Sequence, residues 1–175
     1  MTTDPILFYL AAVLVIASLI DIRSFRIPNW LTYSTLAVGI SYFTIVRGYE
    51  GLLFSLAGAA AGFALLILPY IIGGAGAGDV KLMGVVGSFL GAQGVVMVFL
   101  ISCILAGIYA LILISSKGTL IDTLKRYGKI LKGFIITQQF IYIPPSFKEK
   151  QVKICYGLIV ALATGSYLVF GARII

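Results

Sequence analysis

The stretch LMGVVGSFLGAQGVVMVFLISCILAGIYALILISS, residues 82–116, carries no charged side chain. A helix needs about 20 apolar residues to cross the hydrocarbon core of a bilayer, with a range of roughly 17–25. The stretch is therefore too long for one spanning helix, and the GAQG segment at 91–94 offers a turn inside it. We expect a short helix over about 80–90 and a full-length helix over about 95–114.

The rest of the chain shows the same segregation of charge. Of its 175 residues, 61% are hydrophobic and only 11% are charged, more apolar surface than a soluble domain of this size can bury. Lipid offers no hydrogen bonds to the backbone, so the spanning segments are predicted to be helices. GxxxG spacing at 58–62 and 87–91 predicts close helix packing. The other charge-free runs cover residues 5–20, 27–46, 51–78 and 154–172.

The distribution of basic residues decides between five and six spans, because cytosolic loops are enriched in Lys and Arg. With six transmembrane helices, the loops around Asp21 and Asp79 and the segment 117–153 share one side. That side then carries 11 of the 13 basic residues, and only Arg47 and Arg173 remain outside. We therefore expect an all-α membrane protein with a single polytopic domain over 1–175, both termini outside and the basic side in the cytosol.

The segment 117–153 joins the fifth and sixth predicted helices. Basic residues fall largely between its apolar positions, a pattern typical of an amphipathic helix lying on the cytosolic lipid surface. Anionic lipid also explains the net charge of +7 better than nucleic acid does. The apolar residues that recur at helical spacing are Leu120, Leu124, Tyr127, Leu131 and Phe134.

The residue types that the chain lacks narrow its chemistry. It has no histidine, which excludes Ser-His and Cys-His nucleophilic sites and HExxH zinc sites. Cys103 and Cys155 lie in different predicted spans and form no CxxC motif. We expect them to be small apolar core residues rather than a disulfide or a metal site, and we expect no cofactor.

Two of the six acids stand out, because Asp21 and Asp79 each border a predicted span on the cytosolic side. Ionisable groups at membrane depth are costly and tend to be functional. Two such carboxylates can share one proton and act as in aspartic proteases: one takes a proton from water, and the other protonates the scissile carbonyl. Taken singly, Asp21 could pair with an arginine and Asp79 could cap a helix, but their shared side favours the dyad.

The flanking helices suggest which acid holds the proton. Asp21 follows the first predicted span, whose C-terminal end disfavours a carboxylate, whereas Asp79 opens the fourth, whose N-terminal end favours one. We hypothesise that Asp79 is the base and Asp21 the protonated partner. The glycine-rich segment GGAGAGD at 73–79 allows close backbone approach, which suits an extended peptide substrate beside the dyad.

Two segments resemble the motifs of the type IV prepilin peptidases, a family of six-span, GxGD-type aspartic peptidases. They are DIRSFRIPN at 21–29 and GAGDVKL at 76–82. The likeness follows the whole chain in span order and includes Tyr156-Gly157-Leu158. It implies catalytic roles for Asp21 and Asp79. The residues that it implies as supporting the two motifs are Arg23, Arg26, Pro28, Asn29, Gly76, Gly78 and Lys81.

The resemblance also implies a substrate and a location. The expected partner is a prepilin or pseudopilin whose short basic leader is removed after a glycine, at the cytosolic border of the cell's inner membrane. Larger members carry a cytosolic insert with paired CxxC motifs and N-methylate the new terminus. Here only residues 22–28 separate the first two predicted spans. This difference argues against methyl transfer and favours the short, peptidase-only branch that serves Tad/Flp-type pili.

Two other functions stay open at this point. A small proton- or cation-coupled membrane transporter could use Asp21 and Asp79 as its ion site, and it would tolerate Asp→Glu changes better than a dyad. A non-catalytic assembly subunit would tolerate Asp→Asn at both positions.

Overall fold

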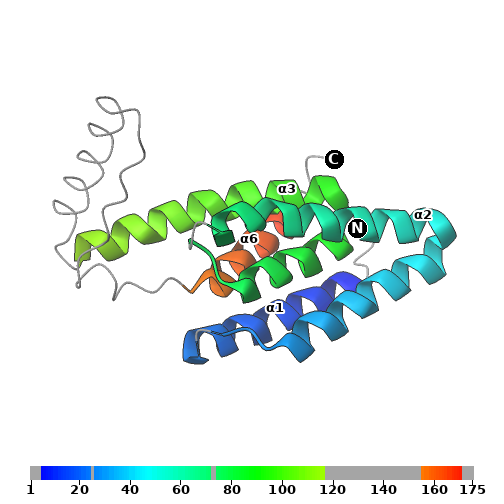
Figure 1. The fold of residues 1–175 in the computed structure, drawn as a ribbon, viewed down its shortest axis with the longest axis horizontal. Helices are drawn as coiled ribbons and strands as arrows, with labels where there is room; N and C mark the ends of the chain where they lie inside the picture. Colours follow the sequence, from blue (N-terminus) through cyan, green and yellow to red (C-terminus); the bar gives the residue numbers. More distant parts are fainter. Residues whose placement is uncertain (1–4, 25, 72–73, 117–154, 171–175) are drawn as a thin grey trace. The chain divides into compact units, whose positions relative to one another are not determined.

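The computed structural model describes residues 5–24, 26–71, 74–116 and 155–170, and the elements within these ranges are all helices. The predicted all-helical fold is confirmed for these residues. The predicted amphipathic helix in 117–153 lies outside them, as do residues 1–4 and 171–175. The helices, shown in Figure 1, are α1 (Pro5–Ser24), α2 (Asn29–Ile71), α3 (Ala77–Ser116) and α6 (Tyr156–Phe170).

A glycine in a left-handed conformation interrupts α2 and another interrupts α3. The φ angle is +60° at Gly48 in α2 and +71° at Gly91 in α3. Glycine adopts such angles freely because it has no Cβ. Figure 1 shows the ribbon of α2 doubling back, and the rings of Phe43 and Phe54, on either side of Gly48, lie 5.1 Å apart. The break at Gly91 confirms the turn predicted within 82–116, although helix resumes directly after it.

Small residues let the second part of α2 pack closely against the first part of α3. A side chain at Gly58 would overlap the carbonyl oxygen of Gly87, and one at Gly62 would overlap that of Met83. The packing is antiparallel, because a higher number in α2 meets a lower one in α3. Backbones approach in this way where both surfaces lack bulk, so the close packing predicted from the GxxxG spacing is confirmed.

The buried core draws on all four described helices, and α2 contributes Leu31 and Leu66 to it. Leu10 of α1, Val86 of α3 and Val160 of α6 are each fully buried. By contrast, the large apolar side chains of Ile45 and Ile71 are 84% and 71% exposed. An apolar surface of this kind suits contact with lipid rather than water.

Length and composition mark the protein as a membrane protein. Among the described helices, three are long and apolar enough to cross a membrane, and a fourth apolar helix is shorter. The three are Pro5–Ser24, Asn29–Ile71 and Ala77–Ile112, and the shorter helix is Tyr156–Val169. The chain divides into two compact units, residues 1–105 with 155–175 and residues 106–154. All the contacts described below lie within the first unit.

Candidate functional site

Asp21 lies in the last turn of α1, and only 6% of the residue is exposed. The helix ends at Ser24, whose hydroxyl contacts the carbonyl oxygens of Ile20 at 2.8 Å and Arg26 at 3.2 Å. The first turn of α6 meets Asp21, and the backbone N–H of Gly157 donates to Asp21 Oδ2 at 3.0 Å. A residue 136 positions away in the sequence therefore orients this carboxylate.

Asp79 lies in the first turn of α3 and is half-buried. Its Oδ2 accepts a hydrogen bond from the N–H of Gly76 at 2.9 Å, while its own N–H donates to the carbonyl oxygen of Gly76 at 3.1 Å. An acid at the third helical position that reaches back to the N-cap N–H is one half of a capping box. Gly76 also leaves room for this bond, because a Cβ there would lie 3.1 Å from Asp79 Oδ2.

Two contacts join the segment that carries Asp79 to the segment that follows Asp21. Gly78 packs against Ile27, and a Cβ at Gly78 would lie 3.1 Å from the Cβ of Ile27. Lys81 Nζ donates to Asn29 Oδ1 at 2.7 Å and lies 5.1 Å from the centre of the Tyr33 ring. The start of α3 is therefore tied to the start of α2. Both contacts link residues of the two motifs.

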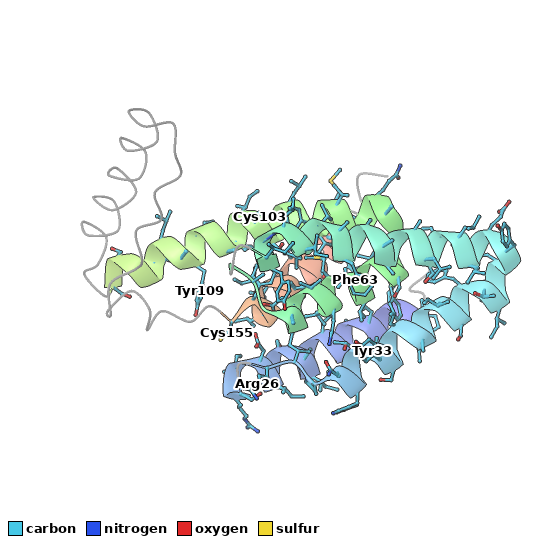
Figure 2. The ribbon with its side chains drawn as sticks, viewed as in Figure 1. Arg26, Tyr33, Phe63, Cys103, Tyr109 and Cys155 are labelled. Atoms are coloured by element: carbon cyan, nitrogen blue, oxygen red, sulfur yellow. The ribbon has the colours of Figure 1, made fainter. Side chains whose placement is uncertain are left out.

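These contacts bring the segments of Asp21 and Asp79 together in the first unit. Among the described residues each acid accepts one hydrogen bond, and in both cases the acceptor is Oδ2. Within the described ranges, Oδ1 of each acid accepts no hydrogen bond. Cys155 lies directly before α6 (Figure 2). Burial raises the pKa of its thiol, and the negative charges of Asp21 and Asp79 raise that pKa further.

The remaining predicted motif residues shape the turn between α1 and α2. Pro28 accepts the N–H of Thr32 at 3.4 Å through its carbonyl oxygen, which begins α2. Arg23 and Arg26 are exposed, and Figure 2 shows Arg26 at this turn. Within the described ranges neither arginine bonds to Asp21, so the alternative of an Asp–Arg pair is not found there; the partner of Asp21 is Gly157.

The two cysteines agree only in part with expectation. Cys103 and Cys155 are free thiols, as predicted. The prediction that both lie in the core is wrong: Cys103 is exposed and Cys155 is only half-buried. The physical reason is that the outer surface of a membrane protein is itself apolar, so a small apolar residue need not be buried.

Gly157 was not recognised from the sequence as a partner of Asp21; its one signal was the family-like Tyr156-Gly157-Leu158. From the sequence, Asp21 is expected only at the C-terminal end of the first helix. In the structure the N-terminal end of α6 also reaches Asp21, and an N–H donor at such an end favours an anion. Asp79 has an equivalent donor in Gly76. Helix ends therefore no longer distinguish the proton holder from the base.

A comparison with models of protein families matches residues 8–111 to the type IV leader peptidase family. The matched region is more than half of the chain and contains both acids and both motifs, whereas α6 lies beyond it. Comparisons with curated proteins and with solved structures give no match. The long apolar helices and the meeting of the two motif segments agree with the match, and on this evidence the chain belongs to the type IV leader peptidase family.

Proposed function

We propose that the protein is an aspartic endopeptidase that removes the leader of a prepilin-like protein, with Asp21 and Asp79 as its catalytic dyad. Membership of the family supports peptidase activity and a prepilin-type substrate. One observation carries the dyad: Gly78 packs on Ile27 and Lys81 bonds to Asn29, so the segment that carries Asp79 contacts the segment that follows Asp21, although the two acids are 58 residues apart in sequence. The Oδ1 atom of each acid accepts no hydrogen bond from a described residue, so a water molecule can bind there.

The proposed reaction uses one proton shared between the two carboxyl groups. The ionised acid takes a proton from water, and the resulting hydroxide attacks the scissile carbonyl carbon. The protonated acid donates to the carbonyl oxygen, giving a neutral tetrahedral intermediate. On collapse the C–N bond breaks, and the acid that took the water proton gives it to the leaving amine. The other acid takes back a proton from the hydroxyl that becomes the new carbonyl oxygen, which restores the starting state. No metal or organic cofactor enters this scheme.

The proposed orientation follows the distribution of basic residues. The glycine breaks at Gly48 and Gly91 divide α2 and α3 into two helical segments each. If each segment spans, the described helices provide six spans, with both termini outside and the dyad on the cytosolic side of the inner membrane. The first segment of α3, residues 77–90, is only about 21 Å long against a core of about 30 Å. Such a short segment would keep Asp79 close to the membrane border, where a leader meets its apolar helix.

The test is cleavage of a candidate prepilin co-expressed with the protein. Leader removal is followed by gel shift and mass spectrometry for wild type, Asp21→Asn and Asp79→Asn. Each substitution should reduce cleavage by at least about 100-fold, the contribution typical of general acid–base groups, with unchanged membrane levels. Glu50→Gln is the matched control, because Glu50 is an exposed acid at the Gly48 break and should be dispensable. Cleavage that persists in either Asp→Asn variant would rule out the dyad.

Asp→Glu variants separate the dyad from the transporter alternative. A dyad depends on the distance between two oxygens and water, so Asp21→Glu and Asp79→Glu should be nearly inactive. An ion site would accept the longer carboxylate and would support uptake in proteoliposomes. Uptake by wild type without prepilin cleavage would favour the transporter.

A further inference from the structure

We infer that Gly157, in the first turn of α6, is a positioning residue of the peptidase: its N–H and its missing side chain hold the Asp21 carboxylate in its reactive orientation. The inference rests on the proposed function. It assigns a role in the site to a helix that lies beyond the region matched by the family model.

A hydrogen bond joins Gly157 to Asp21. The Gly157 N–H donates to Asp21 Oδ2 at 3.0 Å, and both residues are buried. The first N–H groups of a helix have no partner within the helix, so this donor is free to bind a carboxylate. Among the described residues it is the only hydrogen-bond donor to Asp21. Without it the carboxyl group would be free to rotate about its Cβ–Cγ bond.

The space beside Gly157 is filled by the Asp21 side chain. A Cβ at position 157 would lie 3.0 Å from Oδ2, 3.2 Å from Cβ and 3.3 Å from Cγ of Asp21. Three contacts of this kind to one side chain cannot be relieved by moving a single flexible atom. Any residue larger than glycine would therefore displace the carboxyl group relative to Asp79. Gly165, in the same helix, has nothing within 4 Å of an added Cβ.

A second hydrogen bond anchors α6 next to this contact. Tyr156 OH and Ser102 Oγ are 3.1 Å apart, and the Ser102 hydroxyl already donates to the carbonyl oxygen of Phe99 at 2.7 Å. The tyrosine must therefore be the donor to Ser102. This bond ties the first residue of α6 to α3, the helix that carries Asp79. The frame that holds Gly157 thus includes the helices of both acids.

The experiment compares Gly157→Ala, Gly157→Pro and Gly165→Ala as purified full-length protein cleaving a prepilin peptide. Alanine keeps the N–H and adds a Cβ, whereas proline adds a comparable Cβ and removes the N–H. Proline is tolerated in the first turn of a helix, but it restricts the backbone of the preceding residue, Tyr156. The Tm and the Tyr156→Phe variant therefore control for that restriction when the pair is compared. Gly165→Ala is the control for adding a methyl group to α6. For each variant kcat, KM, membrane level and Tm are measured.

We expect Gly157→Ala to lower kcat about tenfold or more, with KM within about twofold and Tm unchanged. Gly157→Pro should lower kcat about 10- to 100-fold further, the loss of a hydrogen bond to a charged group. Gly165→Ala should match wild type. A Gly157→Ala enzyme with wild-type kcat would overturn the inference. A kcat loss matched by an equal loss of folded protein would also overturn it.

Tyr156→Phe keeps the test decisive if the proline variant does not fold. It leaves Gly157 intact but releases the anchor, and kcat should fall by a smaller factor than in Gly157→Ala. A larger fall in kcat for Tyr156→Phe than for Gly157→Ala would contradict the inference that Gly157 acts on Asp21 directly and Tyr156 only through Gly157. Asp21→Asn is assayed beside these variants: if it retains cleavage, the proposed function fails, and if only it loses cleavage, the inference about Gly157 fails alone.

Discussion

The contact between Lys81 and Asn29 allows a quantitative test of how the two motifs are joined. Lys81 Nζ donates to Asn29 Oδ1 at 2.7 Å and sits over the Tyr33 ring at 5.1 Å. Hydrogen bonds from charged donors contribute about 1.5–3 kcal/mol, but Asn29 is exposed, so we take about 1 kcal/mol. The ring contact adds about 0.5–1 kcal/mol at an exposed site. Lys81→Met should therefore cost about 1.5–2 kcal/mol of unfolding free energy.

A double-mutant cycle isolates the hydrogen bond from the ring contact. The free energy of unfolding is measured in mixed detergent micelles for wild type, Lys81→Met, Asn29→Ala and the double variant. The two losses should fall short of additivity by about 1 kcal/mol, because the second substitution removes a bond already lost. Arg23→Met with Asn29→Ala is the control pair and should be additive. Additivity within about 0.3 kcal/mol for Lys81 and Asn29 would refute the contact.

Three other perturbations test separate parts of the structure. Gly87→Ala should destabilise the protein by about 1–3 kcal/mol in the same micelle assay, because the added methyl group would overlap the carbonyl oxygen of Gly58. Gly107→Ala is the control and should not destabilise the protein, because a Cβ at Gly107 has nothing within 4 Å. Tyr33→Leu should cost about 0.5–1 kcal/mol through loss of the cation–π contact while Tyr33→Phe costs almost nothing; equal losses would contradict that contact. In a Cys103→Ala background, Asp21→Asn or Asp79→Asn should speed the alkylation of Cys155 at fixed pH. Removing a negative charge lowers the pKa of the Cys155 thiol and so raises its thiolate fraction. Unchanged alkylation rates in both variants would argue against ionised carboxylates beside Cys155.

Local sequence patterns were sufficient to predict the class of fold and to select two acids as candidates for the site. Long charge-free runs have few physical outcomes, because a lipid-exposed backbone must satisfy its own hydrogen bonds, and helices do so. The turn within 82–116 could be predicted because a run of that length exceeds one span, and glycine at 91 permits the required positive φ. Asp21 and Asp79 could be singled out because buried charge in an apolar chain is costly and therefore rare.

Contacts between segments that are distant in the sequence could not be predicted from local patterns. Nothing local in DIRSFRIPN or GAGDVKL says that Lys81 bonds Asn29 or that Gly78 packs on Ile27, since both contacts depend on how α2 and α3 lie together. Gly157 shows the limit most clearly. Its N–H is unpaired in any helix that starts at Tyr156, but its acceptor, Asp21, is supplied by the other end of the chain.

The sequence by itself therefore determined that this chain is a helical membrane protein with two candidate acids, because burial of charge and satisfaction of the backbone are local requirements. Only the tertiary structure decided what surrounds those acids. Hydrogen-bond partners and room for a side chain depend on atoms from helices far apart in sequence. It is this packing that places the N-terminus of α6 against Asp21 and removes the helix-end distinction between the two carboxylates.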